Sequence, residues 1–296
     1  MDYHINNIGK TPLVRLSKFE QENNIKCHIF AKLEYDNPFG SIKDRSALKM
    51  ILKATQKYPN NANLHFVEAS SGNLGISVSA ICNILGYSST IIMPENMSQK
   101  RKDLINYYGA KLILSKEENE MSGCIEIAKQ LVNTNKKYIY LDQFNNSSNV
   151  DAHIDTGREI YYQLKKNVDY VICGIGSGGT ITGIGKFLCQ FGCKLIGVEP
   201  SASPIITKGY AGKHNIPGIG AGFIPEILNL SLIDKTIAVS DKEALEECEI
   251  IKRTENLFIG ISSGAVIAAC KHFCLENEID NKNIVLIFAD GESRYK

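Results

Sequence analysis

Apolar positions along the chain follow two different spacings. Short apolar runs bounded by turn residues predict β-strands over residues 28–34, 64–69, 89–94, 111–115, 138–144, 170–176, 194–200 and 283–290. Between these runs, helical spacing of apolar residues predicts helices over residues 73–85, 99–108, 124–133, 155–165, 180–190, 241–254 and 264–276. Strands that alternate with helices of this length form βαβ units, so the pattern predicts an α/β protein with mostly parallel sheets.

The length of 296 residues suits two domains or one large one. No low-complexity tract or short repeat interrupts the pattern. Turn-forming residues gather in QFNNSSNVD, residues 143–151, and this segment is the best candidate for a loop between domains.

Charge and composition exclude several classes of protein. A formal net charge of +1 gives no electrostatic basis for binding nucleic acid or an anionic membrane surface. No apolar run approaches the roughly 18 residues that a membrane-spanning helix needs. The N-terminal segment MDYHINNIGKTPLVRL lacks the basic start and apolar core of a signal peptide, so we expect a cytoplasmic protein.

The nine cysteines are scattered, mostly within apolar segments, and we expect reduced, buried thiols. Cys270, His272 and Cys274 lie near one another in the sequence, but no further Cys or His pair completes four ligands. The sequence therefore predicts no metal site.

A lysine stands at the start of the first strong helix, in NPFGSIKDRSALKM. Asn37–Gly40 forms a turn, and Ser41 with Asp44 predicts a capping box that begins the helix at Ser41. Lys43 then lies near the second helical position, where the helix dipole opposes a cation by about 0.3–1 kcal/mol. Either Lys43 points into water, or the field lowers its pKa and makes the amine a nucleophile or base.

Small residues follow several strands at their carboxyl ends, where ligands collect in open α/β folds. EASSGNLGISVS, residues 68–79, either forms a cradle for an anion such as a carboxylate or merely connects a strand to a helix. CGIGSGGTITGIG, residues 173–185, allows the backbone to wrap round a phosphate. In FIGISSGAVIAA, residues 258–269, Ser262 or Ser263 either caps a helix or presents a hydroxyl to a ligand.

The phosphate turn also matches a dinucleotide fingerprint. Gly174, Gly176 and Gly179 satisfy G-x-G-x-x-G, and Glu199 follows at the end of the next strand. By itself this pattern favours a nucleotide about as much as any other phosphate. The dense GSGGT run and its place past the middle of the chain favour a compact terminal phosphate.

One ligand accounts for a reactive lysine, two anion cradles and a hydroxyl pair. Pyridoxal 5′-phosphate needs an amine for its aldehyde, an anion site for its phosphate and a group facing its ring nitrogen, and its amino-acid substrate brings a carboxylate.

The chain also resembles a known family over nearly its whole length. The segments IGKTPLVRL, KLEYDNPFGSIKDR, SSGNLGIS, MPENMSQKRKDLINYYGAKLILS, GIGSGGTITG, VEP, GIGAGFIPEIL, SLIDKTIAVSD and GISSGA occur in this order. They are similar to those of the cysteine synthases (O-acetylserine sulfhydrylases). This resemblance implies two three-layer α/β domains with the PLP-dependent tryptophan-synthase-β-like fold. Residues 36–145 would form a smaller, mobile domain for the substrate carboxylate, and 1–35 plus 146–296 a larger domain for the cofactor phosphate.

The resemblance also implies roles for matched residues. Lys43 would form the internal aldimine and then remove the substrate's α-proton. The cofactor would be held by Asn73 at its ring oxygen, by Ser262 at its pyridine nitrogen, and by Gly176, Ser177, Gly178, Gly179 and Thr180 at its phosphate. The substrate carboxylate would be held by Ser70, Ser71, Asn73 and Gln143.

The implied reaction is β-replacement on O-acetylserine or O-phosphoserine with sulfide, giving L-cysteine through an α-aminoacrylate. Leu74 departs from the family pattern, which has a hydroxyl there, and Phe39 is bulky before the lysine. Two alternatives therefore stay open: cysteine as the β-substrate, releasing hydrogen sulfide and forming serine, lanthionine or cystathionine, and an amine nucleophile giving a 2,3-diaminopropionate precursor. The resemblance further implies a homodimer, with a serine acetyltransferase as a candidate partner.

Overall fold

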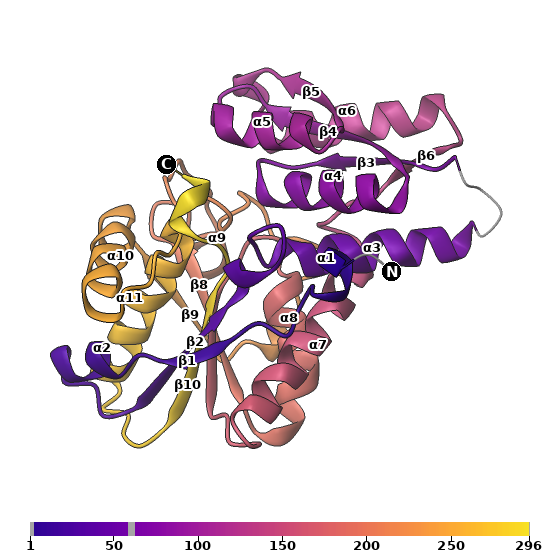
Figure 1. The fold of residues 1–296 in the computed structure, drawn as a ribbon. Helices are drawn as coiled ribbons and strands as arrows, with labels where there is room; N and C mark the ends of the chain where they lie inside the picture. Colours follow the sequence, from indigo (N-terminus) through magenta and orange to yellow (C-terminus); the bar gives the residue numbers. More distant parts are fainter. Residues whose placement is uncertain (1–2, 59–62, 296) are drawn as a thin grey trace. The chain divides into compact units, whose positions relative to one another are not determined.

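The computed structural model describes residues 3–58 and 63–295, and the chain folds into two compact units (Figure 1). Unit 1 comprises Met1–Ile8 and Asn37–Asn149, and unit 2 comprises Gly9–Asp36 and Val150–Lys296. Ile5 groups with unit 1 because it is buried in the same apolar cluster as Phe39, whereas the sequence-based division placed it with the larger domain.

Unit 1 is built on a four-stranded parallel sheet in the order β5-β4-β3-β6. Its elements are α1 (Tyr3–Asn6), α3 (Lys43–Lys57), β3 (His65–Ala69), α4 (Asn73–Leu85), β4 (Ser88–Pro94), α5 (Gln99–Tyr107), β5 (Lys111–Ser115), η2 (Glu117–Asn119), α6 (Glu120–Thr134) and β6 (Tyr138–Tyr140). Helix α7 (Ser147–Gln163) begins in unit 1 and continues into unit 2.

Alternate residues of the central strands of unit 1 face two apolar clusters. Phe66 and Ile91 pack in the cluster that contains residues of α3, α4 and α5. Their neighbours Val67 and Ile92 pack against Cys124 and other residues of α6. Helices α4 and α6 therefore cover opposite faces of the sheet, giving three layers (Figure 1).

Unit 2 is built on a six-stranded sheet in the order β1-β2-β10-β7-β8-β9, parallel except for β1. Its elements are β1 (Leu13–Arg15), α2 (Ser17–Glu22), β2 (His28–Leu33), η1 (Glu34–Asp36), β7 (Tyr170–Gly174), α8 (Gly179–Leu188), η3 (Cys189–Phe191), β8 (Lys194–Pro200), α9 (Ile205–Lys208), η4 (Leu230–Leu232), β9 (Lys235–Val239), α10 (Asp241–Glu255), α11 (Ile261–Glu276), β10 (Asn283–Phe288) and η5 (Glu292–Arg294).

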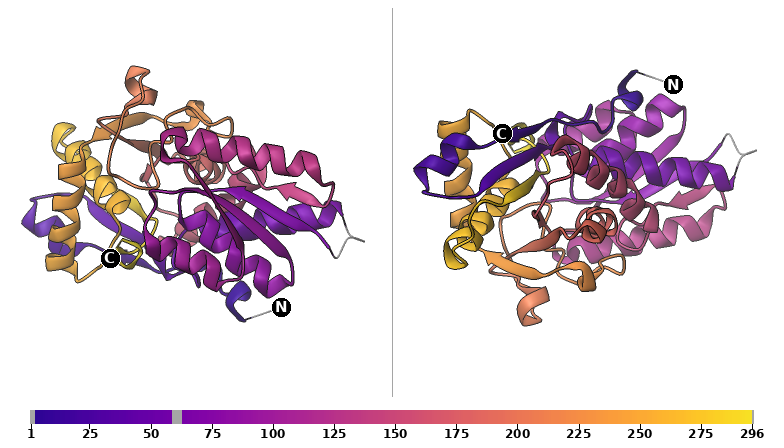
Figure 2. Two further views of the ribbon diagram at one scale, coloured as in Figure 1. Left: turned by 90° about the horizontal axis from the view of Figure 1, so that it is seen from above. Right: turned by 90° about the horizontal axis from the view of Figure 1, so that it is seen from below.

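Helices cover both faces of this second sheet. Helices α10 and α11 pack together on one side, and α7 and α8 lie on the other (Figures 1 and 2). The strands between them carry continuous apolar runs such as Val171–Cys173, which are buried because both faces are covered. The predicted α/β class with mostly parallel sheets is confirmed.

The predicted loop over residues 143–151 is wrong in its second half, where α7 already begins at Ser147. The side-chain oxygen of Asn146 accepts a hydrogen bond from the Ser148 N–H at 3.0 Å. A polar residue here therefore starts a helix rather than keeping the chain irregular. Among the described residues, no helix is long and apolar enough to cross a membrane.

Candidate functional site

Lys43 is the first residue of α3, and its side chain is half-buried. The predicted capping box is wrong: the helix begins two residues after Ser41 with Ile42 as its N-cap, although the Ser41 hydroxyl accepts the Lys43 N–H at 3.3 Å. The Asp44 carboxylate instead accepts the Phe39 N–H at 2.7 Å and the Ser77 hydroxyl at 2.5 Å. Because Ser77 belongs to α4, Asp44 fixes the start of the lysine helix to the helix that follows the asparagine turn.

The turn between β3 and α4 carries the predicted anion cradle. The hydroxyl of Ser70 accepts the N–H of Gly72 at 3.2 Å and that of Gly75 at 3.0 Å, which orders the turn from within. Helix α4 starts at Asn73, its N-cap Gly72 has no side chain, and the Gly75 N–H in its first turn is already bonded to Ser70. Ser71 and Asn73 are half-buried and therefore reachable, while Ser70 lies deeper.

Arg101 contacts this turn from another helix, and the sequence did not reveal it. It lies on α5 and is largely buried, and its Nη1 donates to the Ser71 carbonyl at 3.4 Å. A Cβ atom added to Gly72 would lie 2.9 Å from Arg101 Nε, so the glycine lets the guanidinium approach the backbone. A buried cation beside a helix N-terminus strengthens a site for an anion.

Gln143 follows strand β6, the neighbour of β3. Its Nε2 donates to the Ala69 carbonyl at 3.1 Å, and its own carbonyl accepts from Asn149 Nδ2 at 2.8 Å. Parallel strands end at the same edge of the sheet, and this brings Gln143 to the turn that carries Ser70, Ser71 and Asn73.

Leu74 points away from the anion cradle. Its side chain is 2% exposed and belongs to the apolar core of unit 1. The turn therefore presents backbone N–H groups and serine hydroxyls, with no hydroxyl at position 74.

Glu68 lies beneath the same turn, fully buried on β3, and neither of its carboxyl oxygens has a hydrogen-bond partner among the described residues. Burial raises the pKa of Glu68 well above its ordinary value, and the negative charge of Asp142 adds to this. The N–H groups of Gln143 and Asp142 and the charge of Lys43 act in the opposite direction, though neither N–H reaches hydrogen-bond geometry.

Glu68→Gln should therefore change the pH dependence of stability. The pKa of Glu68 is raised in the folded state. Its stabilising contribution to the free energy of unfolding is therefore fully present below the pKa of the unfolded state and is lost as pH rises through the pKa of the folded state. Urea unfolding of the cofactor-free protein should show the variant gaining stability relative to wild type as pH rises above the ordinary carboxyl pKa towards the raised pKa of Glu68. Parallel pH profiles for the two proteins would contradict this assignment.

The phosphate turn of unit 2 joins β7 to α8. An added Cβ at Gly176 would lie 2.2 Å from the Gly218 carbonyl oxygen, so only glycine allows this approach. Gly178 has φ +81°, in the left-handed region that favours glycine, and α8 begins at Gly179 without a side-chain cap. Ser177 is buried in the turn and Thr180 is half-buried in the first turn of α8. The first N–H groups of α8 are thus placed to receive an anion.

Ser262 lies in the first turn of α11, which starts at Ile261 with Gly260 as its N-cap. The hypothesis that Ser262 or Ser263 is the N-cap is therefore wrong. The Gly260 N–H donates to the Asp290 carbonyl just after β10. Because β10 neighbours β7, Ser262 and the phosphate turn share the carboxyl edge of the sheet of unit 2.

Glu199 does not act as the acidic partner of a dinucleotide ribose. Its carboxylate is buried and accepts the N–H of Ile206 at 2.9 Å and of Thr207 at 3.1 Å, together with the Thr207 hydroxyl. These contacts hold the start of α9, so this carboxylate is already engaged by its own chain.

The cysteines are all free thiols, seven of them buried. Cys270 and Cys274 lie with their sulfurs 4.0 Å apart, while His272 pairs with Glu243 at 3.1 Å. Within residues 3–58 and 63–295, no group of three or more His, Cys, Asp or Glu side chains is placed to hold a metal ion.

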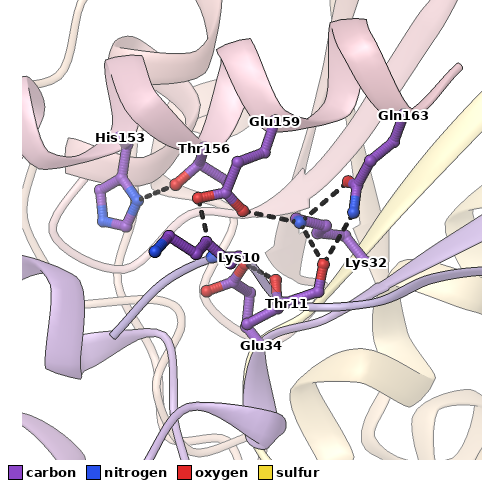
Figure 3. A network of polar contacts seen from close by, with 8 residues as sticks. All are labelled: Lys10, Thr11, Lys32, Glu34, His153, Thr156, Glu159 and Gln163. Carbon is purple, nitrogen blue, oxygen red and sulfur yellow. Dashed lines mark hydrogen bonds and ion pairs between the residues drawn. The ribbon is translucent and has the colours of Figure 1, made fainter. Parts of the chain in front are cut away.

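A second lysine, Lys32 on β2, is fully buried (Figure 3). Its Nζ donates to the Thr11 carbonyl at 2.6 Å, to Glu159 Oε2 at 2.8 Å and to Gln163 Oε1 at 3.0 Å. Glu159 and Gln163 lie on α7, so this amine joins α7 to strand β2 and is engaged structurally.

The family model described as "Pyridoxal-phosphate dependent enzyme" matches residues 5–290, and the chain belongs to this family. A cysteine synthase of Buchnera aphidicola subsp. Schizaphis graminum is 44% identical over 300 residues, covering 97% of this chain and 92% of that protein.

Solved structures of similar proteins support the same family. A cysteine synthase of Entamoeba histolytica superposes with a TM-score of 0.95 at 33% identity, covering 100% of this chain and 89% of that one. A hydrogen sulfide-producing enzyme of Fusobacterium nucleatum gives a TM-score of 0.95 at 36% identity, covering 100% of both chains. The predicted family resemblance, tryptophan-synthase-β-like fold and pyridoxal-phosphate-dependent enzyme class are confirmed.

Proposed function

We propose that this enzyme forms L-cysteine from an activated serine, O-acetylserine or O-phosphoserine, by replacing the β-substituent with sulfide. The observation that carries this proposal is the likeness to the Buchnera cysteine synthase across 97% of the chain. The Entamoeba structure supports it at the level of the fold, since it covers the whole of this chain.

The residues present fit pyridoxal phosphate. We assign the cofactor phosphate to the turn Gly176–Thr180, whose uncapped helix N-terminus and close backbone approach at Gly176 suit a compact anion. We assign the aldehyde to Lys43, the ring oxygen to Asn73 and the ring nitrogen to Ser262. A neutral hydroxyl at Ser262 would leave that nitrogen unprotonated, which would favour loss of a β-substituent over transamination.

When bound, pyridoxal phosphate supplies an aldehyde for the substrate amine and a conjugated ring that withdraws electrons from the α-carbon. Lys43 would act twice: its Nζ would hold the aldehyde at rest, and its free amine would take the proton from the substrate's α-carbon. Asp44 and Ser77 keep the start of α3 in place for both roles, because they fix it to α4.

The substrate carboxylate is assigned to Ser70, Ser71, Asn73 and Gln143. Ser71 and Asn73 are half-buried at the start of α4, and Gln143 is held beside them by its bond to Ala69. The cation of Arg101 beneath Ser71 adds to the attraction for this anion. These residues orient the substrate so that its α-proton is presented to Lys43.

A second candidate uses cysteine as the β-substrate and releases hydrogen sulfide. The Fusobacterium structure favours it, because it covers this chain and its own completely at 36% identity. A third uses an amine nucleophile to give a 2,3-diaminopropionate precursor, and the buried Leu74, which removes a hydroxyl from the carboxylate turn, is its motivation.

A spectral titration separates these candidates. Purified enzyme with pyridoxal phosphate is titrated with O-acetylserine, O-phosphoserine and cysteine, and the visible band is followed before and after adding sulfide. We expect O-acetylserine or O-phosphoserine to shift the band and sulfide to restore it with formation of cysteine. A shift with cysteine alone, together with sulfide release, would instead establish the second candidate. Restoration only by an amine would establish the third.

We also propose that unit 1, predicted from the sequence as residues 36–145, acts as the substrate-carboxylate domain and that unit 2, predicted as residues 1–35 plus 146–296, acts as the phosphate-binding domain. The family resemblance further supports a cytoplasmic homodimer with a serine acetyltransferase as candidate partner. Sedimentation of the purified enzyme tests the dimer, and a monomer at working concentration would refute it.

A further inference from the structure

His153 is a fully buried histidine that no role described above uses. It lies on α7 and reaches two threonines. Its Nε2 is 3.3 Å from the hydroxyl oxygen of Thr180, in the first turn of α8, and its Nδ1 is 3.2 Å from the hydroxyl oxygen of Thr156 (Figure 3 shows the Thr156 contact). The ring therefore connects a buried hydroxyl to a half-buried one at the phosphate turn.

Tight packing of α7 on α8 holds the ring in this place. A Cβ added to Gly183 would lie 2.2 Å from the Val150 carbonyl oxygen and 2.6 Å from His153 Cβ. Gly157 likewise lets α7 approach the backbone of Ile184. Because neither glycine has a side chain, His153 packs directly against the first turns of α8.

The phosphate turn contains no cationic side chain in CGIGSGGTITGIG, residues 173–185. From this turn itself an anion receives only N–H groups and hydroxyls, so the direction of each hydroxyl proton affects its binding. A phosphate dianion only accepts hydrogen bonds. Thr180 must therefore direct its own proton to the phosphate, and its oxygen is left to accept from a neighbour.

We infer that His153 is a positioning residue for the cofactor phosphate. It donates Nε2–H to the Thr180 oxygen, so that the Thr180 proton is directed outward, and its Nδ1 accepts the Thr156 hydroxyl proton, which fixes this tautomer. This inference rests on the proposed function, because it takes the turn Gly176–Thr180 as the phosphate site.

The test compares two replacements that each keep one half of the ring's hydrogen bonding. His153→Gln places an amide donor near the position of Nε2, whereas His153→Asn reaches only as far as Nδ1. Dissociation constants of pyridoxal phosphate and, separately, of inorganic phosphate are measured on cofactor-free protein. We expect His153→Asn to weaken both about tenfold and His153→Gln less than about threefold. In a Thr180→Val background, His153→Asn should cause no further loss.

Thermal unfolding of the cofactor-free variants distinguishes a purely structural role. Equal losses of affinity in both His153 variants, in proportion to their loss of stability, would overturn the inference. So would wild-type affinity in His153→Asn while Thr180→Val binds weakly. If Thr180→Val binds both phosphate compounds as well as wild type, the proposed phosphate site itself fails.

The wild-type protein provides a second measurement that does not depend on any variant folding. Nitrogen-15 NMR of labelled histidine reports which ring nitrogen carries the proton. With pyridoxal phosphate bound, we expect His153 to be protonated at Nε2 and unprotonated at Nδ1. The opposite tautomer would refute the proposed hydrogen bonds of His153 to Thr180 and Thr156.

Discussion

Lys43→Ala should lower kcat/KM by about 10³-fold or more and abolish the visible absorption of the cofactor-bound enzyme. The expected loss is large because one amine serves as both the attachment point and the proton acceptor, and a general base alone contributes about 10²–10⁴-fold. Activity assays, absorption spectra and mass mapping after hydride reduction measure the change. The reduced cofactor should be found on the peptide that contains Lys43.

The matched control is Lys49→Ala, on the same helix and also half-buried. It should keep the absorption band and nearly full turnover. Hydride reduction that labels Lys32 instead of Lys43, or full turnover in Lys43→Ala, would disprove the assignment. Lys32 provides a useful contrast, because its amine is already hydrogen-bonded to Thr11, Glu159 and Gln163.

Lys32→Met should lower the free energy of unfolding by about 3 kcal/mol, within the range for removing one partner of a buried ion pair. Methionine keeps most of the volume but removes the charge that Glu159 Oε2 meets at 2.8 Å. Glu159 is 20% exposed, so water relieves part of the penalty and the lower end of that range is expected. Urea unfolding of the cofactor-free protein measures this loss of stability, and we expect the dependence of the free energy of unfolding on urea concentration to be unchanged.

Lys242→Met is the control for this second prediction. Lys242 is 84% exposed and lies 3.7 Å from Glu246 on the same helix, so its loss should change stability by less than about 0.5 kcal/mol. Similar effects for both variants would show that the buried network in Figure 3 contributes no more than a surface pair. The double variant Lys32→Met with Glu159→Leu should recover part of the loss, since it removes the stranded charge too.

The helix starts show where sequence reasoning succeeded and failed. The spacing of apolar residues and the turn residues located α3, α4 and α8 to within a few positions, because both depend on the local sequence. The predicted capping box failed because the Asp44 carboxylate instead accepts a hydrogen bond from Ser77, which is distant in the sequence. Strands β1 (Leu13–Arg15) and β9 (Lys235–Val239) were not among the predicted strands.

Residues that support the site were harder to predict than those assigned to contact ligands. Glycines and hydroxyls in the turns stand in motifs, so Gly176 and Thr180 could be named from sequence. Arg101, Glu68 and His153 lie in ordinary helices and a strand, without any local pattern. Their positions depend on packing, such as the approach of Arg101 to the backbone of Gly72.

The sequence alone determined the α/β class, because it follows from periodicity, and motifs together with the family resemblance proposed which residues bind an aldehyde and a phosphate. Only the tertiary structure decided which neighbour each of these groups meets. Glu199 is used to hold α9, Leu74 is turned into the core, and His153 is placed behind Thr180. Each outcome depends on contacts between segments far apart in the chain, where burial and hydrogen-bond geometry, rather than local preference, set the free energy.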